Sequence, residues 1–179
     1  MQLIKITEES QIPLNYENTP VWELIAYQNL GVEFKTYNSA QLLIGMCMDN
    51  RKQLRIPENF AYIIRTGGAN LRYSEFKVSY AIAIGGVKYI VLIAHNNCGM
   101  VNLVSKREQF IEGLCKNANW SRSRAEEHFM NYAPIFEIDN EVEFVFNESK
   151  RLAQKYPGVN AVPLLYSIED NMLSVILEK

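Results

Sequence analysis

The chain has 179 residues, of which 48% are hydrophobic, and its formal net charge at pH 7 is −2. This length suffices for one globular core that buries roughly 70% of the surface of the unfolded chain. The near-neutral charge, without a basic stripe, argues against nucleic acid or an anionic membrane as a partner. The N-terminus lacks the basic and apolar regions of a signal peptide, and the apolar stretch of residues 80–94 is interrupted by Gly85, Gly86 and Lys88, as no membrane span would be. We therefore expect a single cytoplasmic domain over residues 1–179.

Strand and helix patterns alternate along the chain after an N-terminal arm. Residues 1–40 indicate an irregular arm with one helix near residues 20–30. Short apolar runs rich in β-branched and aromatic residues predict parallel strands that are covered on both faces. These runs are residues 42–46, 61–65, 89–95 and 161–167. The helices expected between and after them lie near residues 75–85, 103–117, 121–132 and 139–156.

Capping and turn residues mark the ends of several elements. The predicted N-caps are Ser74, Ser121 and Asp139, and the predicted stops are Gly85-Gly86 and Pro157-Gly158. The polar residues 169–171 predict a hairpin that leads from the fourth strand into an antiparallel edge strand. The predicted fold is therefore a three-layer α/β structure, with about four parallel strands, one antiparallel edge strand and helices on both faces.

Cysteine, histidine and carboxylate side chains gather at the carboxyl ends of two predicted strands. In "CMDNR", residues 47 to 51, the period of two in an extended chain puts Cys47, Asp49 and Arg51 on one side. The third strand ends in "HNNCGM", where His95 and Cys98 are three residues apart in a turn. Ligands of open α/β sheets bind at such strand ends, and two thiolates with one imidazole suit tetrahedral zinc. We predict one zinc ion per chain on the two cysteines and the histidine, with a fourth position for water, substrate or a carboxylate.

Each of these residues has a simpler explanation when it is taken alone. A lone buried cysteine is usually a small core residue, a lone histidine is usually a hydrogen-bonded bystander, and Asp49 with Arg51 could be a surface ion pair of little energetic value. The joint placement at strand ends favours the metal site. Cys115 is expected to be a packed thiol, with a fourth structural ligand as the alternative. His128 is expected on a helix surface, with a proton shuttle as the alternative.

The two motifs together resemble the signature of the β-class carbonic anhydrases, C-x-D-x-R with H-x-x-C-G. "RTGGAN" between the motifs and "GVKYIVLIAH" before the second one add to the resemblance, which extends over residues 41–104. The short chain and the "CMD" wording resemble the compact methanogen-type branch of this family. That branch contains relatives that resemble carbon disulfide and carbonyl sulfide hydrolases and share the zinc site.

The resemblance implies a function and a role for each site residue. Zinc would be held by Cys47, His95 and Cys98, while Arg51 would hold Asp49 away from the metal so that water can bind. The implied reaction is the reversible hydration of carbon dioxide to bicarbonate by zinc-bound hydroxide, because zinc lowers the pKa of its water. Asp49 would orient the hydroxide, and the guanidinium fork would fix the carboxylate in a way that lysine could not reproduce.

Glycine-rich turns near these motifs are candidates for substrate binding. Backbone N–H groups around Gly99 could stabilise the developing bicarbonate oxygens, and Gly67 and Gly68 could form a wall of the pocket. A hydrolase of carbon disulfide or carbonyl sulfide with the same zinc site remains an alternative function. A third is a non-catalytic zinc protein whose fourth ligand is Cys115 or a fixed Asp49.

The resemblance also implies a homodimer or a dimer of dimers. The N-terminal arm carries apolar residues that could pack on a partner subunit, namely Trp22, Leu24, Ile25 and Tyr27.

Overall fold

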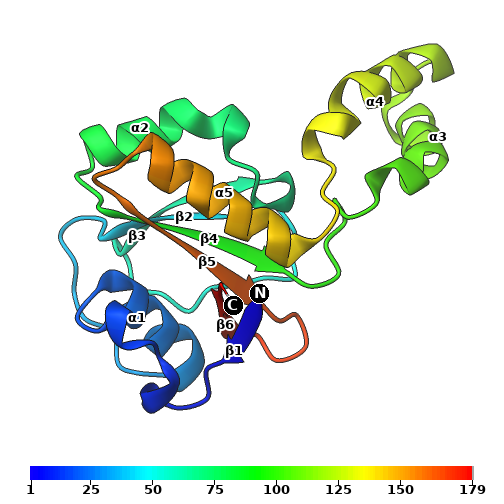
Figure 1. Cartoon of the computed structure of the whole chain (residues 1–179). Helices are drawn as coiled ribbons and strands as arrows, with labels where there is room; N and C mark the ends of the chain where they lie inside the picture. Colours follow the sequence, from blue (N-terminus) through cyan, green and yellow to red (C-terminus); the bar gives the residue numbers. More distant parts are fainter. Residues whose placement is uncertain (179) are drawn as a thin grey trace.

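Buried apolar runs form the centre of a six-stranded mixed sheet in the computed structural model, which describes residues 1–178 (Figure 1). Every residue of the second strand is buried, as expected for a strand with neighbours on both edges and helices on both faces. The strands are β1 Gln2–Lys5, β2 Leu42–Cys47, β3 Ala61–Thr66, β4 Tyr89–His95, β5 Asn160–Tyr166 and β6 Leu173–Leu177. The helices are α1 Pro20–Ile25, η3 Ala26–Leu30, α2 Glu75–Ala83, α3 Arg107–Ala118, α4 Arg122–Phe136 and α5 Glu141–Lys155, with shorter turns between them.

The strand order places the candidate motifs at the point where the sheet topology reverses. The order is β1-β6-β5-β4-β2-β3, in which β2 pairs in parallel with both β3 and β4, and β4 pairs in parallel with β5. The chain therefore leaves β2 toward one side of the sheet and leaves β4 toward the other side. The crevice outside the carboxyl ends of these two strands is the usual ligand position in such sheets. The predicted fold class is confirmed.

The terminal strands extend the sheet beyond the predicted hairpin. The strand β6 pairs antiparallel with β5, as predicted, but β1 then pairs antiparallel with β6 and forms the edge of the sheet. The run "QLIK" of β1 has only four residues and is largely exposed. Pairing with β6 stabilises β1 as a strand, and the sequence pattern does not predict this pairing.

Two apolar layers cover the sheet, one on each face. The helices α2 and α5 pack on one face, where Val78 and Val145 meet Leu43 and Leu92. The helix α1 and the π-helical turn η3 cover the opposite face, where Leu24 packs with alternate residues of the same strands. Figure 1 shows α2 and α5 above the sheet and α1 below it.

The prediction that apolar residues of the N-terminal arm pack on a partner subunit is wrong. Leu24, Ile25 and Tyr27 are buried in the chain's own core, and Trp22 packs against that core. The sheet needs an apolar layer on this face, and the N-terminal segment supplies it from within the same chain. Leu24, Ile25 and Tyr27 therefore offer no apolar face to a second subunit, and Trp22 is only partly exposed.

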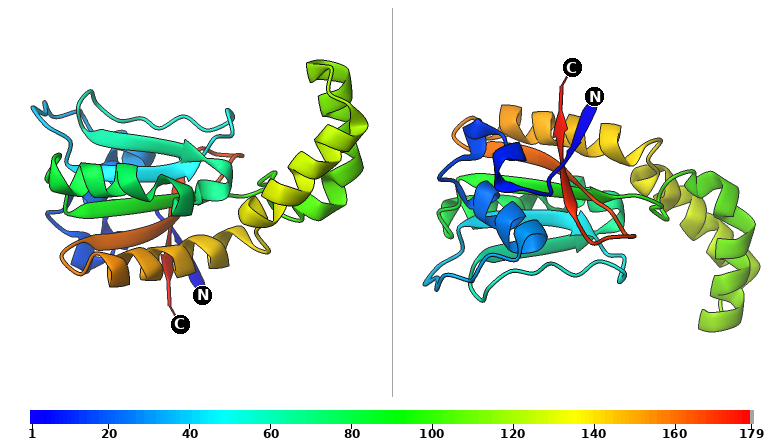
Figure 2. Two further views of the ribbon diagram at one scale, coloured as in Figure 1. Left: turned by 90° about the horizontal axis from the view of Figure 1, so that it is seen from above. Right: turned by 90° about the horizontal axis from the view of Figure 1, so that it is seen from below.

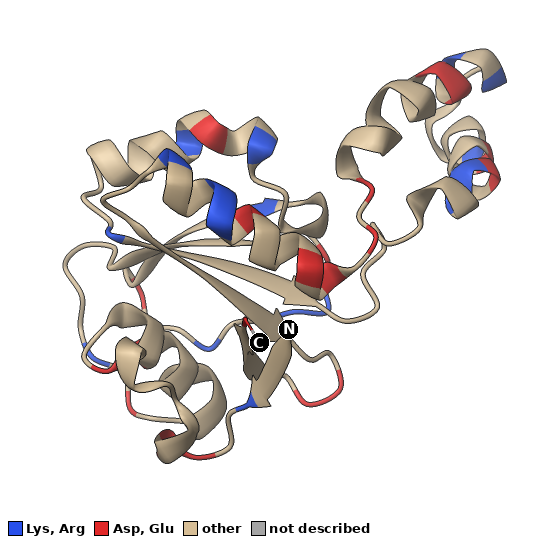
Figure 3. Cartoon of the chain, in the orientation of Figure 1, with Lys and Arg blue, Asp and Glu red and all other residues tan. Residues whose placement is uncertain are grey.

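A helical hairpin, residues 103–136, projects from the carboxyl edge of the sheet (Figure 2). Its helices α3 and α4 pack against each other through Phe110 and Phe129, whose rings are 5.3 Å apart. Acidic and basic residues occur on both the hairpin and the sheet body (Figure 3). None of the helices in residues 1–178 has the length and apolar character needed to cross a membrane.

The N-caps of the helices lie at or next to the residues predicted from the sequence. The Ser121 hydroxyl accepts a hydrogen bond from the Arg124 N–H and begins α4, as predicted. Ser74 lies at the start of α2 but makes no capping hydrogen bond through its side chain. The predicted cap Asp139 is wrong by one residue, because the Asn140 side chain caps α5 instead. Asn and Asp are about equally good caps, so the sequence alone does not separate these neighbours.

Candidate metal centre

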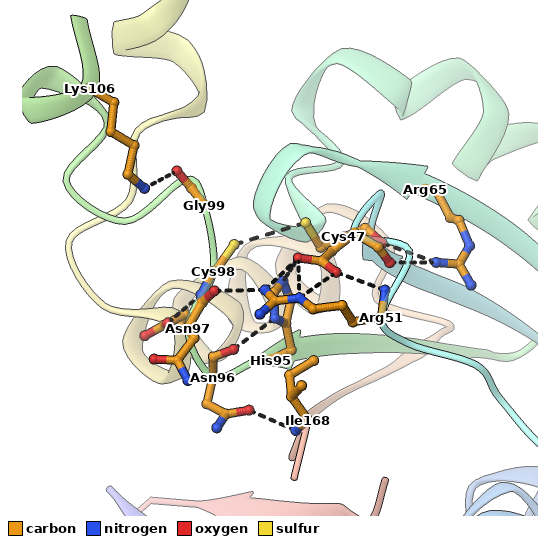
Figure 4. A network of polar contacts seen from close by, with 12 residues as sticks. Cys47, Arg51, Arg65, His95, Asn96, Asn97, Cys98, Gly99, Lys106 and Ile168 are labelled. Atoms are coloured by element: carbon orange, nitrogen blue, oxygen red, sulfur yellow. Dashed lines mark hydrogen bonds and ion pairs between the residues drawn. The ribbon is translucent and has the colours of Figure 1, made fainter. Parts of the chain in front are cut away.

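Two strand ends and one turn bring three ligand side chains together. Cys47 is the last residue of β2, His95 is the last residue of β4, and Cys98 lies in the turn that follows β4. All three are at least 95% buried, and one ligand atom from each lies within 4.8 Å of the others. Figure 4 shows the three side chains converging from these segments. We call this group, Cys47, His95 and Cys98, the Cys–His–Cys centre.

The histidine of this centre has one nitrogen engaged and one nitrogen orphaned. The His95 Nδ1 lies 2.9 Å from the Asn96 carbonyl oxygen, which can only accept, so Nδ1 carries the proton. Its Nε2 is then an unprotonated acceptor, and it is buried without a hydrogen-bond partner among the described residues. A buried orphaned nitrogen is costly, and this tautomer is the one that ligates metals through Nε2. The donor set therefore fits a metal ion.

The two sulfur atoms lie at the spacing that a zinc ion requires. The Sγ atoms of Cys47 and Cys98 are 3.9 Å apart, and two Zn–S bonds of about 2.3 Å at a tetrahedral angle give about 3.8 Å. The hydrogen bond that they share lowers the pKa of the Cys47 thiol and, together with burial, raises the pKa of the Cys98 thiol. Thiolate formation at Cys47 is further favoured by the backbone N–H groups of Asp49 and Gly68.

A carboxylate clamped by arginine stands beside the centre. The Arg51 Nη2 donates to Asp49 Oδ2 at 2.6 Å and its Nε donates to Oδ1 at 3.0 Å, which is the two-point geometry of a strong charge-assisted pair. The Asp49 Oδ2 is also 3.9 Å from His95 Nε2. The Arg51 guanidinium holds the pKa of the Asp49 carboxyl well below its usual range. Asp49 is thus an ionised group within reach of the metal position but engaged elsewhere.

The glycines predicted to bind substrate take different positions. Gly68 adopts a left-handed backbone with φ +62° and presents its N–H to Cys47. Gly67 allows close approach, because a Cβ there would lie 3.0 Å from the Met100 sulfur and 3.2 Å from the Phe136 ring. Gly99 is exposed, and its carbonyl accepts a hydrogen bond from Lys106 Nζ (Figure 4). Gly67 and Gly68 therefore shape the wall of the site, and their role in binding substrate stays a prediction.

An apolar cavity of about 420 Å³ lies between the helical hairpin and the strand ends. Met48 and Met100, which lie close to Cys47 and Cys98 in sequence, form one side of it together with Gly67 directly after β3. His128 from α4 lines the cavity, packed against the Trp120 and Tyr132 rings at 5.2 and 4.7 Å. The remaining lining residues are Leu103, Phe110, Phe129, Tyr132, Ala133 and Phe136.

The third cysteine does not join the centre. Cys115 is a half-buried thiol on α3, in the projecting hairpin, and it is outside the only group of potential metal ligands within residues 1–178. A structural site closed by Cys115 is therefore not formed in this conformation.

Three polar residues near the site are not among those predicted from the sequence. The Glu141 carboxylate, at the start of α5, accepts a hydrogen bond from the Cys98 N–H at 3.1 Å. The Asn96 side-chain oxygen accepts a hydrogen bond from the Ile168 N–H, and its amide nitrogen donates one to the Glu169 carboxylate. These two bonds fix the turn after β4. Lys52 follows Arg51 directly and is 1% exposed. A lysine in a loop is ordinarily solvated, so only the packing of residues 48–60 reveals its burial.

Sequence comparison finds neither a protein-family model nor a curated protein that matches this chain. Solved structures match by fold. The carbonic anhydrase of Glaciozyma antarctica superposes with a TM-score of 0.61 at 19% identity, covering 93% of this chain and 100% of that one. The β-carbonic anhydrase isoform I of Trichomonas vaginalis gives 0.57 at 17% identity, with 83% and 90% covered. A carbon disulfide hydrolase gives 0.55 at 18% identity, with 79% and 81% covered. The chain thus has the fold of the β-carbonic anhydrases, which confirms the resemblance at the level of fold.

Proposed function

We propose that this protein is a zinc enzyme that reversibly hydrates carbon dioxide to bicarbonate. The observation that carries the proposal is the buried Cys–His–Cys centre with an orphaned His95 Nε2, placed beside an aspartate that Arg51 holds. A purely structural zinc site has no use for a separately clamped carboxylate. A zinc ion held by the centre would act as a Lewis acid and make hydroxide available near neutral pH.

The dyad of Asp49 and Arg51 would position the attacking oxygen. An ionised Asp49 accepts a hydrogen bond from that oxygen and so turns a lone pair toward the carbon of the substrate. Arg51 fixes the carboxylate from two nitrogens, and its Nη2 also donates to the Asn97 carbonyl at 3.0 Å. This extra contact anchors the guanidinium to the turn that carries Cys98. Asp49 is thereby kept in an orientation that leaves room at the metal position.

The apolar cavity would receive an uncharged substrate. Its wall is formed by methionine and aromatic side chains, which favour an apolar gas over water. Carbon disulfide and carbonyl sulfide are apolar in the same way, and the fold of the chain is also that of a carbon disulfide hydrolase. Hydrolysis of these sulfur compounds at the same centre is therefore the second candidate function.

We further propose that the protein is cytoplasmic and forms a homodimer or a dimer of dimers. We also propose that it belongs to the compact methanogen-type branch of the family. Thiol ligands stay reduced in the cytosol, which supports that compartment. Large apolar side chains on β3 and α2 remain exposed, which supports a second copy of the chain as partner.

Stopped-flow hydration of carbon dioxide by protein of verified zinc content tests this function. The hydrolysis of carbonyl sulfide and carbon disulfide is measured in parallel on the same preparation. We expect carbon dioxide hydration with the highest kcat/KM of the three. A preference for carbon disulfide or carbonyl sulfide would select the second function, and no turnover of any of the three would leave a non-catalytic zinc protein.

A further inference from the structure

A buried lysine without a partner lies in the loop that follows Cys47 and carries Asp49 and Arg51. Lys52 directly follows Arg51, is 1% exposed, and its Nζ has no hydrogen-bond partner within residues 1–178. Its backbone is fixed, because the Lys52 carbonyl accepts a hydrogen bond from Arg65 Nη2 at 3.2 Å. The other terminal nitrogen of Arg65 lies 3.4 and 3.3 Å from the carbonyls of Cys47 and Asp49. The lysine thus belongs to the same anchored loop as the site residues, and its unpaired burial is unfavourable for folding.

The charges that face Lys52 come mainly from the site. Burial lowers the pKa of Lys52, whereas the thiols of Cys47 and Cys98 and the carboxylate of Asp49 raise it, and the Arg65 guanidinium lowers it further. The anionic groups lie in the site itself. The Lys52 ammonium is therefore stabilised by the anionic groups of the centre and is shielded from solvent.

The balance of charge at the centre depends on this ammonium. A bound divalent metal requires both thiols of the centre to be deprotonated. The two thiolates, Asp49 and Glu141 would then carry four negative charges, while the metal, Arg51, Arg65 and Lys52 would carry five positive charges. One monoanion would balance the charges of this set of groups. Without Lys52, the same monoanion leaves an uncompensated negative charge in a buried site, which is unfavourable.

We propose that Lys52 is an anion-positioning residue of the metal centre, whose buried ammonium favours a monoanion such as bicarbonate beside Cys47, His95 and Cys98. This inference rests on the proposed function, because it needs a metal in the centre. It adds a residue that the dyad mechanism does not use, and it explains why an unpaired cation is kept in the interior.

Anion binding by the cobalt-loaded protein tests the proposal without an activity measurement. Lys52→Met removes the charge and keeps much of the side-chain volume. Lys88→Met is the matched control, because Lys88 is exposed and precedes β4 at the opposite end of the sheet. Thiocyanate is titrated against each protein at one pH and followed by the visible absorption of cobalt, after elemental analysis has verified equal cobalt content.

We expect Lys52→Met to weaken thiocyanate binding by about tenfold, because one favourable charge–charge interaction in a partly shielded site is lost. Lys88→Met should bind like the wild type, and Lys52→Arg should retain most of the affinity. Denaturant unfolding of the metal-free protein supplies a second readout. Lys52→Met should unfold at an equal or higher denaturant midpoint than the wild type, because it removes a buried unpaired charge.

Two results would overturn the inference alone. One is thiocyanate affinity in cobalt-loaded Lys52→Met within twofold of the wild type. The other is a lower unfolding midpoint of metal-free Lys52→Met, which would make Lys52 a structural residue. Lys52→Gln repeats the test if the methionine variant does not fold. Wild-type protein that binds neither cobalt nor zinc would overturn the proposed function as well, so the two failures are distinguishable.

Discussion

Asp49 stands between two competing positions, the Arg51 guanidinium and the space in front of His95 Nε2. Its Oδ2 is 2.6 Å from Arg51 Nη2 and 3.9 Å from His95 Nε2. Because Arg51 lowers the pKa of Asp49, the carboxyl stays ionised from pH 6 to 9. A pH dependence of activity in that range therefore reflects the supply of hydroxide, not the titration of Asp49.

The zinc content of variants should distinguish the three predicted ligands of the centre from Cys115. Zinc ligation needs two thiolates and a neutral imidazole, so Cys47→Ser, His95→Ala and Cys98→Ser should each lose zinc. Cys115→Ser should keep one zinc per chain, because Cys115 lies in the projecting hairpin. Elemental analysis of the purified variants measures this. Zinc lost from the Cys115 variant but retained in the others would contradict the assignment.

At the residue scale, the sequence predicts the grouping of Cys47, His95 and Cys98, because strand ends fix where side chains meet. It does not predict Lys52 or Glu141. Their positions depend on how a loop and a distant helix pack around the centre, and neither residue carries a local pattern.

At the scale of elements, the sequence pattern predicts the parallel strands β2, β3, β4 and β5. Short apolar runs that alternate with helical segments identify buried strands clearly. The four-residue strand β1 is not predicted in this way. Its register with β6 is set by tertiary pairing. An ion pair also holds β1 in place, since Lys5 Nζ lies 2.5 Å from Asp170 in the β5–β6 turn.

The cap of α5 should contribute measurably to stability. Asn140 Oδ1 accepts hydrogen bonds from the N–H groups of Val142 and Glu143, both at 3.0 Å. Asn140→Ala should therefore lower the free energy of unfolding by about 1 kcal/mol. Ser74→Ala, at an N-cap position without a capping bond, should change it much less. Equal losses in the two variants, measured by denaturant titration, would show that the capping bond is not the cause.

The Lys5–Asp170 pair predicts a specific acid dependence of stability. The Lys5 ammonium lowers the pKa of Asp170 from 3.8 to about 2. A depressed carboxyl pKa stabilises the fold above the unfolded-state value, and the contribution is lost as pH falls through the folded-state value. Asp170→Asn should thus reduce stability at pH 7 by less than about 1 kcal/mol, since the pair is partly exposed. The difference from wild type should shrink between about pH 4 and pH 2.

The exposed carboxyl of Asp139 provides the control for this measurement. Asp139→Asn should leave the acid dependence of unfolding close to that of the wild type. A difference for Asp170→Asn that stays constant down to pH 2 would exclude the Lys5 pair as its origin.

At the scale of the whole molecule, the helical hairpin lines an apolar cavity beside the strand ends, while another apolar surface lies on β3 and α2. The exposed side chains of β3 and α2 include Ile63 and Phe76, and Ile84 is exposed directly after α2. β3 is also one of the two edge strands of the sheet, and such an edge with apolar neighbours is typical of a subunit contact. The sequence predicts the dimer by resemblance, but it places the contact wrongly in the N-terminal arm.

Light scattering at micromolar concentration should show a homodimer or a dimer of dimers. Phe76→Glu should shift the protein toward the monomer, because Phe76 is 84% exposed within the apolar surface of α2. Leu14→Glu is the control, since Leu14 is 85% exposed on another part of the chain and should leave assembly unchanged. A monomeric wild type would refute the predicted assembly.

The most direct test of the central claim is carbon dioxide hydration from pH 6 to 9 by wild type, Arg51→Ala and Asp49→Ala, each at verified zinc occupancy. We predict wild-type activity that climbs with pH. Arg51→Ala should retain zinc and lose at least about tenfold in rate, a barrier increase of about 1.4 kcal/mol or more, because Asp49 is then free to occupy the metal position. Asp49→Ala should also retain zinc and show lower activity with a different pH profile. Wild-type rates in zinc-loaded Arg51→Ala would contradict the dyad mechanism and leave Asp49 and Arg51 as a structural ion pair.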